Sequence, residues 1–143
     1  MARIKVDLPA EFAFTTQIPV RITDLNYGGH VGNDTILSIL HEARVQFIQH
    51  HGYTELKLAG VGLIMSDVAI EFKQELFYPD NIRASVTAGD LTKVSFDLYY
   101  KLEKIVEGKT ILVAAAKTGM VCFDYEKKKV AAVPGEVIEK FGL

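Results

Sequence analysis

The chain has 143 residues, of which 49% are hydrophobic and 24% charged, and its formal net charge is −2. This length and composition predict one globular domain. Because there is no basic excess, we expect no nucleic-acid partner and no anionic membrane surface. No segment has the apolar length of a membrane span, and the first residues do not resemble a secretion signal. The single cysteine, Cys122, cannot form an internal disulfide, which agrees with a cytoplasmic protein.

The first predicted element is a strand over Phe12–Thr23, which is dense in β-branched and aromatic residues. A polar, glycine-rich segment follows over residues 24–32. Helical periodicity then extends from about Thr35 to His51, with Asn33 or Asp34 as the expected N-cap. Apolar residues cover more than one narrow stripe of this helix, so we expect other elements to wrap around it.

The rest of the chain is predicted to form strands with alternating apolar residues and one short terminal helix. The strand ranges are Gly62–Met65, Asp67–Gln74, Asn81–Ala88, Lys93–Glu103 and Thr110–Asp124. Glu107-Gly108 predicts a hairpin turn, and Pro134 predicts the start of the terminal helix. One long helix followed by clustered strands is typical of an α+β fold with an antiparallel sheet.

Several common catalytic motifs are absent from the sequence. Gly60-Val61-Gly62 begins a dinucleotide-binding pattern, but Met65 stands where the third glycine would be. His41-Glu42 begins a zinc-protease pattern, but Val45 replaces its second histidine, and we expect no metal site. Cys122 lies within an apolar strand and is interpreted as an inert core thiol.

The segment from Asp24 to Asn33 is the strongest candidate for a site. Its glycines allow the backbone to approach a ligand closely, and it leads into a helix N-terminus, where negative charge is favoured. It also contains an acid, an amide and an imidazole, in Asp24, Asn26 and His30. These groups could supply an oxyanion site with acid–base chemistry. The same residue types also favour an ordinary turn, so a purely structural segment stays open.

This segment resembles the opening of the hotdog-fold thioesterases of the 4-hydroxybenzoyl-CoA and acyl-CoA type. The resemblance lies in the run Val20-Arg21-Ile22-Thr23-Asp24-Leu25-Asn26-Tyr27-Gly28-Gly29-His30-Val31-Gly32-Asn33 and in His41-Glu42-Ala43-Arg44. The family commonly reads Asp-x-Asp, a glycine turn and His-Val-Asn-Asn, then Glu-x-Ala-Arg on the helix. The segments Asp67–Gln74 and Phe77-Tyr78-Pro79-Asp80 fit its second half. The resemblance implies one hotdog domain over residues 1–143, in which a curved antiparallel sheet of about five or six strands wraps the long helix.

The resemblance also implies an activity, hydrolysis of an acyl-CoA thioester without metal or organic cofactor. It further implies a homodimer or homotetramer whose active sites lie between subunits. One departure matters, because Asn26 stands where the family often has its catalytic carboxylate, and an amide cannot act as a base. A non-catalytic hotdog protein that binds acyl-CoA therefore stays open as an alternative.

The candidate catalytic residues follow from the chemistry that thioester hydrolysis requires. We expect His30 and Asn26 to position water and the thioester carbonyl, and Asp24 or Glu42 to supply the carboxylate. Each has a structural alternative. Asp24 could instead support the turn. Glu42 could form an ion pair with Arg44 or another basic residue or cap backbone donors, and His30 could bond to the backbone.

Further contacts are expected from the same turn and from basic side chains. The expected oxyanion donors are the backbone N–H groups of Gly29, Val31 and Gly32. The expected substrate contacts are Tyr27, Gly28, Asn33 and Lys93. Candidates for contacts with the nucleotide phosphates also include Lys73, Arg83 and Lys101, although solvated surface lysines and arginines are common.

Overall fold

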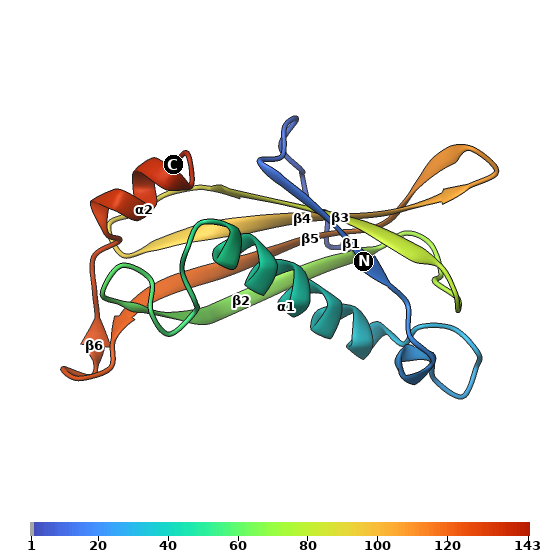
Figure 1. Ribbon diagram of the computed structural model, residues 1–143, viewed down its shortest axis with the longest axis horizontal. Helices are drawn as coiled ribbons and strands as arrows, with labels where there is room; N and C mark the ends of the chain where they lie inside the picture. The colour runs from blue at the N-terminus through green and yellow to red at the C-terminus, as the bar shows by residue number, and fades with distance from the viewer. Residues whose placement is uncertain (1) are drawn as a thin grey trace.

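A computed structural model describes residues 2–143, which form one antiparallel sheet and two α-helices (Figure 1). The strand order is β1-β3-β4-β5-β2, and β6 pairs with β5. The elements in chain order are β1 (Phe14–Pro19), the 3₁₀ turn η1 (Ile22–Asp24), α1 (Asn33–His50), β2 (Gly62–Phe72), β3 (Asn81–Gly89), β4 (Ser95–Val106), β5 (Lys109–Asp124), β6 (Lys129–Val130) and α2 (Gly135–Lys140). Within residues 2–143, neither helix is long and apolar enough to cross a membrane.

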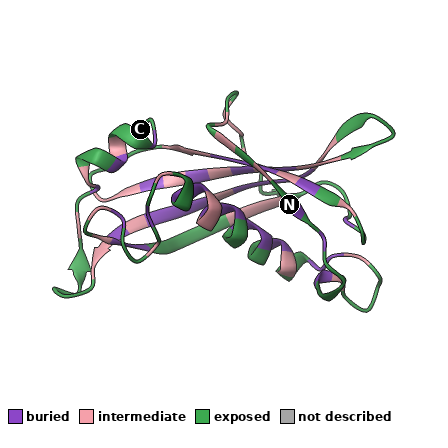
Figure 2. Ribbon diagram, in the orientation of Figure 1, coloured by how far each residue is buried: buried purple, intermediate pink, exposed green. Residues whose placement is uncertain are grey.

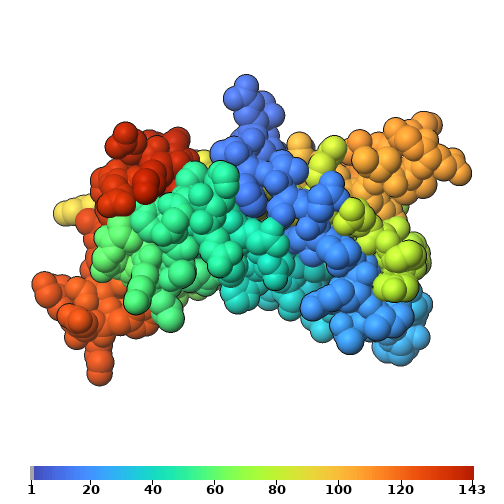
Figure 3. Space-filling model, viewed as in Figure 1, coloured from blue at the N-terminus to red at the C-terminus, as the bar shows by residue number. Residues whose placement is uncertain are grey.

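The core lies between α1 and one face of the curved sheet, as the predicted α+β fold requires (Figure 1). The buried side chains alternate along the strands, with Ile82, Ala84 and Val86 on β3 facing inward. Helix α1 contributes Leu40 and Phe47, which are fully buried. Buried and exposed residues also alternate along α1 in Figure 2. The sheet covers one side of the helix in a protomer, and the opposite side is open at the surface (Figure 3).

A buried polar network anchors α1 to this core. Arg44 Nε donates to the Glu55 carboxylate at 3.0 Å, and another guanidinium nitrogen donates to the Tyr100 hydroxyl at 3.3 Å. The Tyr100 hydroxyl also lies 2.7 Å from Thr118 Oγ1. Arg44 therefore joins the helix to the following loop and to two central strands. The acid that pairs with Arg44 is Glu55, so the structural alternative in which Glu42 pairs with Arg44 does not hold.

Several predicted boundaries need correction. The first strand ends at Pro19, and a 3₁₀ turn occupies part of its predicted range. Helix α1 starts at Asn33 with Gly32 as its N-cap, so neither predicted N-cap is right. The two predicted strands around Ser66 form one strand, β2, with an irregular register at this position. Ser66 Oγ donates to the Gly119 carbonyl at 3.1 Å, so the bulge is held by the neighbouring strand.

The turn and the terminal helix agree with their predictions. Glu107 and Gly108 have φ values of 51° and 77°, as a tight two-residue hairpin requires. Helix α2 begins directly after Pro134. Cys122 is buried in β5, and burial raises the pKa of its thiol to about 11. A thiol in this state is protonated at neutral pH, which agrees with its interpretation as an inert core residue.

Candidate active site

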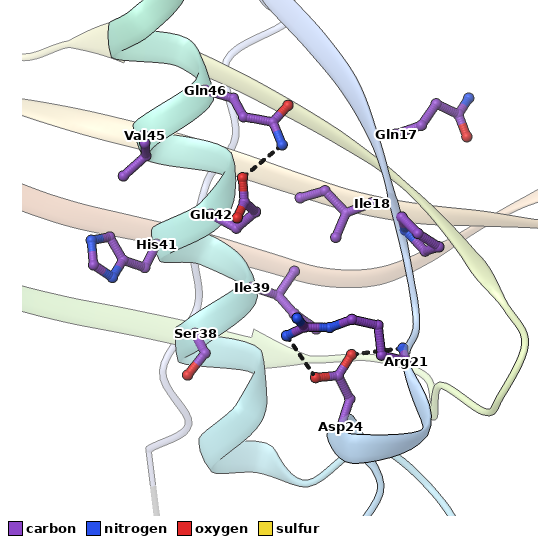
Figure 4. A pocket seen from close by; sticks show the side chains of 11 residues that line it. Gln17, Ile18, Arg21, Asp24, Ser38, Ile39, His41, Glu42, Val45 and Gln46 are labelled. Carbon is purple, nitrogen blue, oxygen red and sulfur yellow. Dashed lines mark hydrogen bonds and ion pairs between the residues drawn. The ribbon is translucent and has the colours of Figure 1, made fainter. Parts of the chain in front are cut away.

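Some of the predicted site residues line two cavities beside α1, and the others line neither. The first, here called the β1 cavity, lies between α1 and β1 and has a volume of about 360 Å³ (Figure 4). The second, called the β2 cavity, lies between the start of α1 and the segment that follows β2, and has a volume of about 490 Å³. Asp24 and Glu42 line the β1 cavity, whereas His30 and Asn33 line the β2 cavity. A single chain therefore does not bring the four predicted catalytic residues into one cavity.

Both carboxylates of the β1 cavity contact neighbours on their own segment (Figure 4). Asp24 is buried, and its carboxylate accepts the backbone N–H of Arg21 at 2.8 Å and the Arg21 guanidinium at 3.5 Å. These bonds close the 3₁₀ turn η1. Glu42 accepts a bond of 2.8 Å from the Gln46 amide, one helical turn further on. The geometry favours the structural alternative for Asp24 and leaves Glu42 as a partly solvated helix residue.

Asn26 organises the glycine-rich turn. The side-chain oxygen of Asn26 accepts the backbone N–H of Gly28 at 2.8 Å, and the backbone N–H of Asn26 donates to the His30 carbonyl at 2.9 Å. The first of these bonds is the local contact by which asparagine stabilises turns. Asn26 lines neither cavity, and Tyr27 beside it is fully exposed in the protomer. Asn26 thus shapes the segment that carries His30.

Some of the backbone N–H groups expected to bind the oxyanion already donate to a carbonyl of the chain, and others do not. The N–H of Gly29 donates to the Asn26 carbonyl at 3.1 Å, and the N–H of Val31 donates to the Leu76 carbonyl at 2.9 Å. The N–H groups of Gly32 and Asn33 have no acceptor within residues 2–143. They lie at the N-terminus of α1, where the helix favours negative charge.

Position 32 has little space for a side chain while Asp34 keeps its present orientation. A Cβ atom at this position would lie 2.6 Å from the Asp34 carboxylate, which is too close for an ordinary contact. The family's asparagine at this position therefore could not replace Gly32 unless the Asp34 side chain moved. The unsubstituted backbone keeps the helix N-terminus accessible.

The orientation of His30 is fixed by the backbone next to it. Its Nδ1 lies 3.1 Å from the Val31 carbonyl, which can only accept a hydrogen bond. The neutral ring therefore carries its proton on Nδ1, and Nε2 remains as a free acceptor. The ring also packs edge-to-face on Phe77, with 6.5 Å between centroids. His30 combines its predicted bond to the backbone with an imidazole nitrogen available for chemistry.

The β2 cavity contains residues that the sequence did not assign to a site. Phe77 and Lys104 line it, although they are far apart in the chain. Lys104 lies 3.1 Å from the Asp80 carboxylate, and its ammonium is 5.2 Å from the Phe77 ring centroid. The alternating pattern of β4 could place Lys104 on a face of the sheet, but only strand pairing shows that this face adjoins His30.

Of the basic residues expected to contact the substrate, Lys73 lines a cavity and Lys93 does not. Lys73 lines the β2 cavity and pairs with Glu71 at 2.6 Å. Lys93 lines neither cavity, and its carbonyl accepts the N–H of Val133 at 2.9 Å, close to the start of α2. In the described part of the chain, no three His, Cys, Asp or Glu side chains are grouped as metal ligands.

Comparisons with known proteins agree with this fold. The family model of the thioesterase-like superfamily matches residues 20–141. The acyl-CoA thioester hydrolase YbgC of Escherichia coli is 24% identical over 129 residues, with 86% of this chain and 92% of that protein covered. A solved 1,4-dihydroxy-2-naphthoyl-CoA thioesterase from Synechocystis has a TM-score of 0.79 at 20% identity, covering 90% of this chain and 95% of that one. A solved mutant of 4-hydroxybenzoyl-CoA thioesterase, complexed with 4-hydroxybenzoyl-CoA, has a TM-score of 0.80 at 20% identity, covering 90% and 97%.

These matches confirm the resemblance found in the sequence, and the hotdog fold with it. The family match includes the glycine-rich turn, α1 and the strands that line the β2 cavity. The chain belongs to the thioesterase-like superfamily.

Proposed function

We propose that this protein hydrolyses acyl-CoA thioesters to a free acid and coenzyme A in the β2 cavity. The observation that carries the proposal is that His30 lines a cavity at the N-terminus of α1 and that its Nε2 has no hydrogen-bond partner within residues 2–143. Buried Val31, Ile36 and Leu76 give one part of this otherwise polar cavity an apolar wall suited to an acyl group. The related acyl-CoA thioester hydrolase and the two similar CoA thioesterases support the substrate class.

The proposed reaction begins with water that donates a hydrogen bond to His30 Nε2. This water attacks the thioester carbonyl carbon, and the negative charge develops on the carbonyl oxygen. The free N–H groups of Gly32 and Asn33 would hold this oxygen, assisted by the helix dipole. Gly29 and Val31 would support the turn, because their N–H groups already have acceptors. Lys73 and Lys104 would contact the coenzyme A portion.

The proposed active unit is a homodimer or a larger homo-oligomer, joined through β2. This strand is an edge of the sheet, and Ile64, Met65 and Val68 on it are exposed. An exposed apolar edge strand can pair with a second copy of itself. Phe72 at the end of β2 lines the β2 cavity and is also exposed. A second protomer on this edge would therefore cover the cavity and complete its wall.

The test is release of free coenzyme A thiol from a panel of short, long and aromatic acyl-CoAs. We expect at least one thioester to be cleaved catalytically, with the acid and thiol formed in equal amounts. The second candidate is a non-catalytic acyl-CoA-binding protein, favoured by Asn26 at the usual acid position. Tight binding of acyl-CoA without thiol release across the panel would contradict hydrolysis and support this second candidate.

A further inference from the structure

The β2 cavity contains one acidic side chain, Glu75, that the proposed reaction has not yet used. It is the sole carboxylate among the described residues that line this cavity. Asp24 and Glu42, the carboxylates predicted from the sequence, line the β1 cavity instead. Asn26 provides no base in the turn. The cavity that holds His30 therefore has one residue able to act as a carboxylate base.

The backbone around Glu75 is fixed beside the glycine-rich turn. The next residue, Leu76, accepts the N–H of Val31 at 2.9 Å, which ties this segment to the residue after His30. Lys104 Nζ donates to the Glu75 carbonyl at 2.8 Å from β4. Phe77 packs on the His30 ring. Two contacts from the glycine-rich turn and one from β4 thus hold the segment 75–77 against the site.

Charge pairing distinguishes Glu75 from the other acids nearby. Glu71 pairs with Lys73 at 2.6 Å, and Asp80 pairs with Lys104 at 3.1 Å. Both lysines of the cavity therefore have a carboxylate partner already. Glu75 has no ion pair within residues 2–143, so its carboxylate is not committed to holding the fold together. An unpaired carboxylate that lines the same cavity as the His30 imidazole is available to take a proton from water.

We propose that Glu75 is the general base of the hydrolysis, an inference that rests on the proposed function. Water would donate one hydrogen bond to His30 Nε2 and the other to the Glu75 carboxylate. As the water oxygen bonds to the carbonyl carbon, its proton moves to Glu75. The tetrahedral intermediate then breaks its carbon–sulfur bond, and the proton on Glu75 passes to the departing sulfur. The products are one free acid and one coenzyme A thiol, and Glu75 returns to its ionised form.

The experiment compares Glu75→Gln and Glu75→Ala with the wild type, using the best acyl-CoA from the panel. Loss of a general base predicts a fall in kcat of about 100-fold or more, with KM changed by less than about threefold. Sodium formate should restore part of the activity of Glu75→Ala, because a small carboxylate can occupy the place of the missing base. Glu126→Gln, in the exposed turn before β6, is the matched control and should keep wild-type kinetics.

The outcomes separate this inference from the proposed function. If the wild type cleaves acyl-CoA while Glu75→Gln retains kcat within about threefold, Glu75 is not the base although hydrolysis stands. A rise in KM at unchanged kcat would likewise overturn the inference, since it would make Glu75 a binding residue. If kcat falls but formate gives Glu75→Ala no added activity, the loss is structural and the inference fails. No thiol release by the wild type would refute both proposals.

Discussion

The β1 and β2 cavities share a wall in α1, yet their polar groups are engaged differently. In the β1 cavity, Asp24 bonds to Arg21 and Glu42 bonds to Gln46, so each acid contacts a residue within four positions of itself. In the β2 cavity, His30 and Glu75 come from separate segments, and both retain unpaired polar atoms. Short-range pairing stabilises local turns and helices, whereas free groups brought together by the fold are available for chemistry. This difference is the reason that we propose catalysis in the β2 cavity rather than in the β1 cavity.

The largest effect on stability should come from Arg44→Ala, which would damage both cavities by loosening their shared helix. The variant leaves Glu55 and the buried Tyr100 hydroxyl without their partner. Removing one member of a buried pair typically costs about 3 kcal/mol of unfolding free energy. Urea denaturation measures this loss. Arg3→Ala, at an exposed position, is the control, and equal unfolding midpoints for the two variants would refute the anchoring role of Arg44.

The next largest effect should be a loss of activity that is specific to the β2 cavity. A double variant, Ile64→Lys with Val68→Lys, places charges on the exposed edge of β2, where they oppose strand pairing. We expect a folded monomer by light scattering and a loss of activity of about tenfold or more, equivalent to about 1.4 kcal/mol. A monomeric variant that remains fully active would show that the β2 cavity works without a second protomer.

A smaller effect is expected in the β1 cavity from Asp24→Asn. The amide keeps the shape of the side chain but weakens the bonds to Arg21, so the unfolding free energy should fall by about 1 kcal/mol. Because Asp24 is assigned to the turn, kcat/KM should stay within about threefold of the wild type. Unchanged stability combined with a hundredfold loss of activity would instead make Asp24 catalytic.

The smallest effect should be a dependence of stability on pH that arises from His51, which lines neither cavity. Burial lowers the pKa of His51 from its ordinary value of 6.5, and the positive charges of His50 and Lys140 lower it further. Its Nε2 is buried and has no hydrogen-bond partner among residues 2–143. The unfolded chain therefore binds a proton on His51 more readily than the folded chain does. Above pH 6.5 this difference costs no stability, and as the pH falls below 6.5 it lowers the free energy of unfolding.

His51→Leu should therefore flatten the decline in melting temperature between neutral pH and about pH 5.5. The activity profile measured on folded protein should be unchanged by this substitution, since His51 lines neither cavity. An equally steep decline in melting temperature for the variant and the wild type would assign the pH dependence to another group.

The sequence predicted the fold well because its signals were periodic and local. The apolar positions of α1 recur at helical spacing, and the inward residues of β3 alternate. The bulge at Ser66 interrupts this alternation, so one long strand was predicted as two. The side chain of Ser66 bonds to Gly119 on another strand, and no local sequence pattern can associate these two residues.

The site was predicted less completely, because proximity along the chain does not decide which cavity a side chain faces. Asp24 and His30 are six positions apart, yet the turn directs them into different cavities. Conversely, Glu75 lies far from His30 in sequence, and the bond between Val31 and Leu76 brings their two segments to one cavity. The sequence predicted Asn26 as a site residue because it is an amide within the glycine-rich segment. Its bond to Gly28, which shapes the turn, could be identified only from the structure.

The most direct test of the central claim compares one variant from each cavity in the same thiol-release assay. His30→Ala removes the free imidazole of the β2 cavity, and Glu42→Gln neutralises the solvated carboxylate of the β1 cavity. We predict that the wild type cleaves acyl-CoA, that His30→Ala lowers kcat by about 100-fold, and that Glu42→Gln stays within about threefold. The reverse order of the two variants would contradict the assignment, and a wild type that releases no thiol would contradict hydrolysis itself.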